Sequence, residues 1–265
     1  MKHQALTRMV AVTGTLLLPG IAHAAAFFAI VTPSTADSVG WQTATTGNAS
    51  LEFVTGPATP PFGAGSLQFA IGKGLPVKNN VDGGARAVLV TGWAMPLRSL
   101  GGLTYSTYVS SQKHCGGSRK ADAKAVAITL DVDSDGDGVA DDVLIYQPAY
   151  NGQVLCDTWQ QWNATVGLWY STNGGVYEAP GRPLAQYLFE HPQAKIVQDA
   201  ASSKGIALVA GYGHAWRKFE GAADVVTVTS NESSCFCTGD GGMACLPGPQ
   251  GTYDFEPDLV PPPAP

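Results

Sequence analysis

The chain has 265 residues with a formal net charge of −6, and only 14% of its residues are charged. A surface with excess negative charge repels phosphate backbones and anionic lipids, so the composition argues against nucleic-acid partners and against binding to anionic membranes. The 32 glycines and 18 prolines favour a turn-rich β protein over a helical one, and the length suffices to bury one large core.

Residues 1–24 have the pattern of a secretory signal peptide. Lys2 and Arg8 precede an apolar run over residues 9–18, and a small-x-small cleavage pattern ends at Ala24. Cleavage there leaves 13 basic and 21 acidic residues, a net charge of −8. The apolar run is too short to span a bilayer, so we expect no membrane insertion. The pattern predicts a secreted protein, extracellular or periplasmic.

Short runs of alternating apolar side chains, separated by Gly- and Pro-rich turns, recur from about residue 39 onward. The predicted strands cover residues 39–42, 51–54, 67–71, 87–90, 103–109, 126–132, 143–146, 158–163, 166–171, 196–197, 205–212 and 225–229. One short helix is predicted over residues 183–190, because Pro183 suits a first turn and Tyr187 shares a face with Leu184 and Leu188.

Many short strands with one short helix predict an all-β fold, a two-sheet jelly-roll-like sandwich. We assign the sandwich domain to residues 38–230. Residues 25–37 are interpreted as a lead-in to it. Residues 231–265 are rich in Cys, Gly and then Pro, and they are interpreted as a poorly ordered tail.

One stretch stands out chemically, because six carboxylates fall within the twelve residues 131–142 and no Lys or Arg lies among them. Such charges repel one another in a folded protein unless something neutralises them. Ca²⁺ is suited to this, because it accepts six to eight oxygen ligands from a flexible loop. The alternative is a solvated acidic hairpin tip without a metal. We expect a calcium ion in a structural role, because the sequence next to the loop contains no recognisable catalytic base or nucleophile.

Two ligand registers fit this loop. A register beginning at Asp131 imitates an EF-hand loop, with Gly136 at the sixth place and Asp142 at the twelfth. A register beginning at Asp133 resembles the calcium loops of dockerins and thrombospondin type 3 repeats. We favour the second register, with Asp131 or Asp142 supplying an extra oxygen. Its expected ligands are Asp133, Asp135, Asp137, the carbonyl of Val139, and Asp141.

The five cysteines are expected to form disulfides in an oxidising compartment. Cys115 and Cys156 both fall in predicted loops and are candidates for one bridge. Cys235, Cys237 and Cys245 fall in the Gly/Ser-rich tail, where one is left over if the others pair. Zinc is the alternative for these three, but a fourth nearby ligand is lacking.

Six tryptophans and nine tyrosines suit a ligand surface, because aromatic faces stack on sugar rings. The alternative is that most of them belong to the core. Trp169 and Tyr170 are the preferred pair for an exposed aromatic, because adjacent strand residues face opposite ways and one of the two must leave the core. Trp216 is a third candidate for ligand binding.

Catalytic patterns are weak. The Gly-x-Ser-x-Gly nucleophile motif does not occur, the histidines are scattered, and no spacing marks a pair of glycosidase carboxylates. The sequence therefore leaves enzymatic activity open and favours a protein that is not an enzyme.

Several spaced motifs over residues 38–229 occur together, namely Phe53-Val54-Thr55-Gly56-Pro57, residues 103–108, Leu130 to Asp142, Trp159-x-x-Trp162, residues 184–192 and Trp216-x-x-Phe219 before Asp224. Together they resemble a poorly characterised family of exported, calcium-bearing bacterial modules. The resemblance implies a jelly-roll-like sandwich, similar to carbohydrate-binding modules and lectin domains, and a calcium site more than an activity. The five cysteines are not part of that pattern, and Val225 stands where an Asn often follows the Asp.

Three functions follow from these observations. The first is a secreted, calcium-stabilised binding module for a polysaccharide, or another extracellular or cell-surface polymer. The second is a structural cell-surface or matrix protein without a specific small ligand. The third is a secreted hydrolase acting on polysaccharides or esters.

Overall fold

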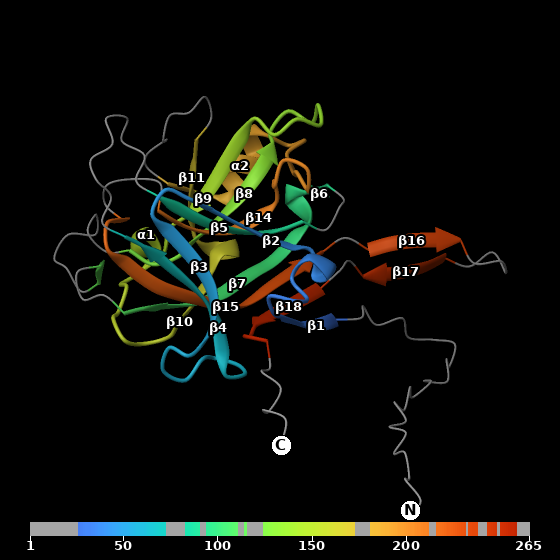
Figure 1. Cartoon of the computed structure of the whole chain (residues 1–265). Helices are drawn as coiled ribbons and strands as arrows, with labels where there is room; N and C mark the ends of the chain where they lie inside the picture. The colour runs from blue at the N-terminus through green and yellow to red at the C-terminus, as the bar shows by residue number, and fades with distance from the viewer. Residues whose placement is uncertain are drawn as a thin grey trace, which may run out of the picture.

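The computed structural model describes residues 26–72, 83–90, 94–110, 114–115, 124–172, 181–211, 216–231, 233–237, 243–247 and 250–258. Within them the chain forms two large sheets, so the prediction of an all-β two-sheet sandwich is confirmed (Figure 1). The segment predicted to be a signal peptide, residues 1–24, lies outside the described residues.

The first sheet has seven strands, and five of them follow the order β1-β18-β15-β4-β3. Of the other two, β7 pairs with β15, and β10 pairs with β7. Its strands are β1 (Ala26–Val31), β3 (Ala49–Thr55), β4 (Gly65–Ile71), β7 (Leu100–Val109), β10 (Gln160–Asn163), β15 (Phe219–Ser230) and β18 (Gln250–Phe255). All pairings are antiparallel except that of β1 with β18.

The second sheet has nine strands in the order β12-β11-β9-β8-β14-β5-β2, with β13 joining β8 to β6. Its strands are β2 (Trp41–Thr46), β5 (Gly84–Leu89), β6 (Met95–Pro96), β8 (Ala127–Asp133), β9 (Asp142–Tyr146), β11 (Leu168–Ser171), β12 (Arg182–Pro183), β13 (Lys195–Ile196) and β14 (Ile206–Gly211).

A separate hairpin of β16 (Ser233–Cys237) and β17 (Met243–Pro247) extends away from the sandwich (Figure 1). The helices are α1 (Pro148–Asn151) and α2 (Leu184–Glu190), and short 3₁₀ turns lie at residues 37–39, 97–99 and 164–166. Helix α2 matches the predicted helix, and every predicted strand overlaps an observed one.

The two ends of the domain differ from the predictions. The supposed lead-in contains strand β1, and the supposed tail contains strand β18, which lies between β1 and β15 in the first sheet. Tyr253 and Phe255 on β18 are buried against Trp41, with ring centroids 5.5 and 5.0 Å apart. The boundaries 38–230 are therefore wrong, because the core is incomplete without segments on both sides.

The core lies between the sheets, where alternate residues of each strand point inward. Trp41, Phe69, Trp169, Tyr187 and Phe219 are among its largest fully buried side chains. Among the described residues, no helix combines the length and apolar character needed to cross a membrane.

Candidate metal centre

The aspartate-rich stretch is a hairpin connection in the second sheet. Strand β8 ends at Asp133, strand β9 begins at Asp142, and Val132 is the register partner of Asp142. Gly136 and Gly138 have φ angles of 87° and 96°, a left-handed conformation that glycine adopts without strain. These two glycines therefore let the loop over residues 133–141 (the aspartate loop) curl back on itself.

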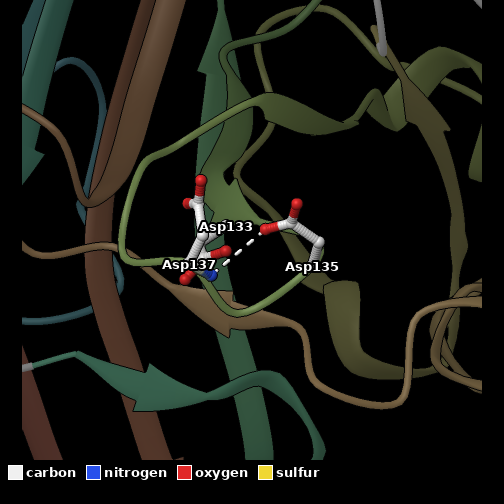
Figure 2. Close-up of side chains that lie close together, drawn as sticks. All are labelled: Asp133, Asp135 and Asp137. Carbon is white, nitrogen blue, oxygen red and sulfur yellow. Dashed lines mark hydrogen bonds between the residues drawn. The ribbon is translucent and has the colours of Figure 1, made fainter.

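Three carboxylates converge in the aspartate loop. Asp133, Asp135 and Asp137 each offer an oxygen, and these oxygens lie within 4.8 Å of one another (Figure 2). Asp133 is buried at the end of β8, whereas Asp135 and Asp137 are exposed. These are the first, third and fifth positions of the register that begins at Asp133.

Backbone amides hold these carboxylates in place. The amide of Gly136 donates to Asp133 Oδ1 at 2.6 Å, and the amide of Gly138 donates to Asp133 Oδ2 at 2.8 Å. The amide of Val139 donates to Asp137 Oδ1 at 2.7 Å. Since an amide uses one lone pair of a carboxylate oxygen, each side chain keeps further lone pairs for a cation.

The donor set fits a hard cation, because it consists of oxygens alone. Lys195 and Lys204 line a hollow of about 500 Å³ that also includes Asp133. Within the described part of the chain, however, no ion pair joins a lysine or arginine to any of the three aspartates.

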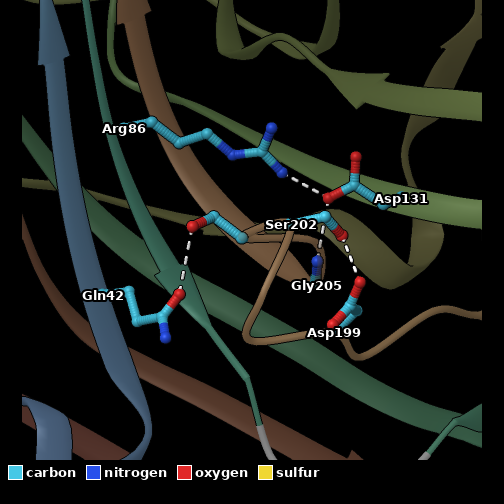
Figure 3. A network of polar contacts seen from close by, with 7 residues as sticks. Gln42, Arg86, Asp131, Asp199, Ser202 and Gly205 are labelled. Carbon is cyan, nitrogen blue, oxygen red and sulfur yellow. Dashed lines mark hydrogen bonds and ion pairs between the residues drawn. The ribbon is translucent and has the colours of Figure 1, made fainter.

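Asp131 does not belong to this group, because it serves another network. Its Oδ2 forms an ion pair with Arg86 of β5 and accepts a hydrogen bond from the amide of Gly205 at 2.8 Å (Figure 3). In the adjacent turn, Asp199 accepts a hydrogen bond from Ser202. Asp131 thus ties β8 to β5 and to the residue just before β14, and its oxygens are not among those that converge in the aspartate loop.

Asp141 and Asp142 also have other partners. Asp141 accepts hydrogen bonds from the amide and the hydroxyl of Ser134, at 2.8 and 2.7 Å, and so closes the base of the loop. Burial raises the pKa of Asp141, but the hydrogen bonds from Ser134 outweigh it and hold the pKa below its usual value. Asp142 is buried and accepts hydrogen bonds from Tyr187 and Ser171, at 2.9 and 2.6 Å. Neither aspartate lies with the three converging ones.

The aromatic ligand candidates are buried. Trp169 is 1% exposed and donates its indole N–H to the carbonyl of Ala164. Tyr170 faces the other way but is covered by Tyr150, with ring centroids 5.0 Å apart, and by Gly181. Trp216 packs against Phe219 at 4.9 Å. The prediction that Trp169, Tyr170 and Trp216 form an exposed ligand surface is therefore wrong.

One predicted disulfide is present, and it joins Cys115 to Cys156. In the β16–β17 hairpin the backbone register places Cys235 opposite Cys245, and Cys237 lies at the end of β16.

The sequence reasoning missed two features at the other side of the sandwich. Asp224 and Asp254 are buried together where β15 meets β18. A mostly apolar cavity of about 900 Å³ lies beside β1 and β18, lined in part by Phe27, Val90 and Tyr253. Both features depend on β18, which the sequence could have indicated through Tyr253 and Phe255 alternating with polar residues. The Pro-rich composition around this segment favoured a disordered tail instead.

Comparison with known proteins assigns no family. No protein-family model matches the chain, and no curated protein sequence matches it. A solved structure similar to the chain is a β-1,2-glucanase from Parabacteroides distasonis, with 10% sequence identity and a TM-score of 0.35. The match covers 82% of this chain and 32% of the glucanase chain. A similarity this distant assigns no activity to the chain.

Proposed function

We propose that this protein is an exported β-sandwich module stabilised by one Ca²⁺ ion in the aspartate loop. The observation that supports the proposal is the convergence of Asp133, Asp135 and Asp137 in a loop shaped by two left-handed glycines. The disulfide between Cys115 and Cys156 and the signal-peptide pattern support an oxidising compartment outside the cytoplasm.

The role proposed for the ion is structural. Asp133, Asp135 and Asp137 would hold it, and its charge would offset the repulsion among them. Asp133 is the register partner of Lys195 on β13, so a fixed loop also fixes the β8–β13 edge of the second sheet.

The test is thermal unfolding with Ca²⁺ and with EDTA. Binding only to the native state at a hundredfold excess over Kd adds about 2.7 kcal/mol, which raises Tm by roughly 5–10 °C. The variant Asp135→Asn/Asp137→Asn should lose this calcium-dependent increase. The variant Asp37→Asn/Glu52→Gln removes two exposed carboxylates elsewhere and should keep it. A wild-type Tm that is the same with Ca²⁺ and with EDTA would contradict the proposal.

A second candidate function is polysaccharide binding, the partner predicted from the sequence. In place of the buried tryptophans, the structure exposes Phe28 by 48% and Phe62 by 52%, with ring centroids 4.9 Å apart. Two adjacent exposed rings suit stacking on sugar faces.

Sedimentation with insoluble cellulose, chitin and xylan tests this second candidate. We expect Phe28→Ser/Phe62→Ser to reduce the bound fraction, and Phe189→Ser, which changes an 88% exposed ring on α2, to leave it unchanged. Wild-type protein that stays in the supernatant with all three polymers would remove this function.

A further inference from the structure

Strand β15 changes partners in its middle. Its first half, Phe219 to Ala223, pairs with β4, and its second half, Val226 to Thr229, pairs with β18. Asp224 lies at the junction, where the pairing with β7 also shifts register. The next residue, Val225, has a φ of 51°, an uncommon conformation for a β-branched side chain. The backbone is therefore bulged at this point, which turns the Asp224 side chain toward the end of β18.

The Asp224 side chain meets Asp254 at this junction. Asp224 is 0% exposed and Asp254 is 1% exposed, and the two carboxyls lie within hydrogen-bonding reach of each other. Asp224 Oδ1 accepts a hydrogen bond from the amide of Phe255 at 3.1 Å. Asp224 Oδ2 and Asp254 Oδ1 are buried and receive no hydrogen bond from another group. Each side chain thus keeps one oxygen whose lone pairs are unsatisfied.

Among the described residues, no ion pair joins a Lys or Arg to either carboxyl. Strands β1, β4 and β7 and the loop over residues 56–64 contain no charged residue. The titratable hydroxyls of β7 are used elsewhere, because Tyr105 donates to the carbonyl of Val126 and Tyr108 donates to Asp157. A further charge that acts on Asp254 is that of Glu256, just after β18, and it is also negative. Two ionised carboxylates in this position would be buried, in contact and unpaired, which costs far more than protonating one of them.

We propose that Asp224 and Asp254 share one proton in the folded protein, and that this shared proton fastens the last strand, β18, to β15. A single O–H···O hydrogen bond uses both unsatisfied oxygens at once and removes one of the two charges. The pairing of β18 with β15, next to β4, thus depends on pH through this shared proton.

The directions in which the surroundings shift the two pKa values agree with this geometry. Burial raises the pKa of Asp224 well above its usual value, and repulsion from Asp254 raises it further. Burial also raises the pKa of Asp254, with repulsion from Glu256 as the second cause. The hydrogen bond raises the pKa of Asp224 and lowers that of Asp254, so the proton resides on Asp224.

The sign of the pH dependence follows from the raised values. A carboxyl that binds its proton more tightly in the folded state stabilises the fold at low pH, and this stability is lost as pH rises through the folded pKa. Strand β1 pairs only with β18 among the described strands, and both strands line the cavity of about 900 Å³. Loss of the proton therefore loosens β18, β1 and one wall of that cavity.

The test compares the pH dependence of Tm in wild-type protein and in Asp224→Asn. An asparagine keeps the acceptor for Phe255 and gives Asp254 a permanent donor, so it imitates the protonated pair. Between pH 5 and pH 9, we expect the Tm of the wild type to fall by roughly 5–10 °C more than the Tm of Asp224→Asn falls. Glu52→Gln, which changes one exposed carboxylate on β3, should follow the wild type. Equal slopes for wild type and Asp224→Asn would overturn the proposal.

A second measurement covers the case in which Asp224→Asn does not fold. Carbon NMR of side-chain carboxyls in the wild-type protein should show two aspartates titrating above pH 5, and Asp254→Asn should leave one signal in that range, that of the buried Asp224. A wild-type protein in which no aspartate titrates above pH 5 would overturn the proposal. A bound cation is the competing explanation, and Asp135→Asn/Asp137→Asn protein separates it. If EDTA lowers the Tm of that variant, a cation is bound between Asp224 and Asp254, and the proposal of a shared proton is wrong.

Discussion

At the scale of single residues, Asp142 joins three elements through one buried carboxylate. Its Oδ1 accepts hydrogen bonds from the amides of Val143 and Thr172, at 2.7 and 2.9 Å. Its Oδ2 accepts hydrogen bonds from the hydroxyls of Ser171 and Tyr187. The side chain therefore connects the start of β9 to the end of β11 and to helix α2. These partners account for its absence from the group of converging aspartates.

The hydroxyl of Tyr187 can be removed without changing the ring. Burial raises the pKa of Tyr187, and the negative charge of Asp142 raises it further, so the phenol stays protonated and donates at neutral pH. Tyr187→Phe should lower the free energy of unfolding by about 1.5 kcal/mol, because a hydrogen bond to a buried charge is lost. Urea unfolding at pH 7 measures this change.

The matched control for Tyr187→Phe is Tyr150→Phe. The hydroxyl of Tyr150 has no hydrogen bond within the described part of the chain, so its removal should change stability by less than about 0.5 kcal/mol. Equal losses in the two variants would show that the Asp142 hydrogen bond contributes nothing.

At the scale of secondary-structure elements, strand β18 decides where the domain ends. It is held by β15 on one side and β1 on the other, and Phe255 is 0% exposed. The Pro- and Cys-rich sequence around it has the composition of a linker, but Tyr253 and Phe255 alternate with the polar Thr252 and Asp254 in the manner of a strand. Its burial, and not the composition of its surroundings, shows that it belongs to the sandwich.

Truncation tests this assignment. A chain ending at Asn231 lacks β18, exposes Trp41 and leaves β1 without its strand partner, so it should fail to unfold cooperatively. A chain ending at Asp258 keeps β18 and should have a Tm within about 2 °C of the full-length protein. Circular dichroism during heating distinguishes the two, and a cooperative transition in the shorter chain would refute the role of β18.

At the scale of the whole molecule, the disulfide links two distant parts of the chain. Cys115 lies between β7 and β8, Cys156 lies before β10, and 41 positions separate them. Closing a loop of that length reduces the conformational entropy of the unfolded chain, which stabilises the fold by about 4 kcal/mol in the chain-entropy model.

Removal of this disulfide should therefore be costly. Cys115→Ser/Cys156→Ser should lower the free energy of unfolding by about 4 kcal/mol in denaturant titrations. Dithiothreitol should bring wild-type protein to the same value and leave the variant unchanged. If the reductant destabilises the variant as much as the wild type, other cysteines hold the fold.

The sequence by itself determined the features that depend on neighbouring residues. Strand alternation, the Pro183 helix start and the aspartate loop are local patterns, because backbone period and turn chemistry act over a few residues. The spacing also favoured the register beginning at Asp133, and the structure brings three members of that register together.

Only the tertiary structure decided the features that depend on distant partners. Arg86 and Tyr187 bind the carboxylates of Asp131 and Asp142, which lie apart from the three converging aspartates, and Tyr150 covers the outward face of Tyr170. No local pattern contains these partners, because burial and charge pairing are set by which strands lie side by side and by what covers each face of a sheet.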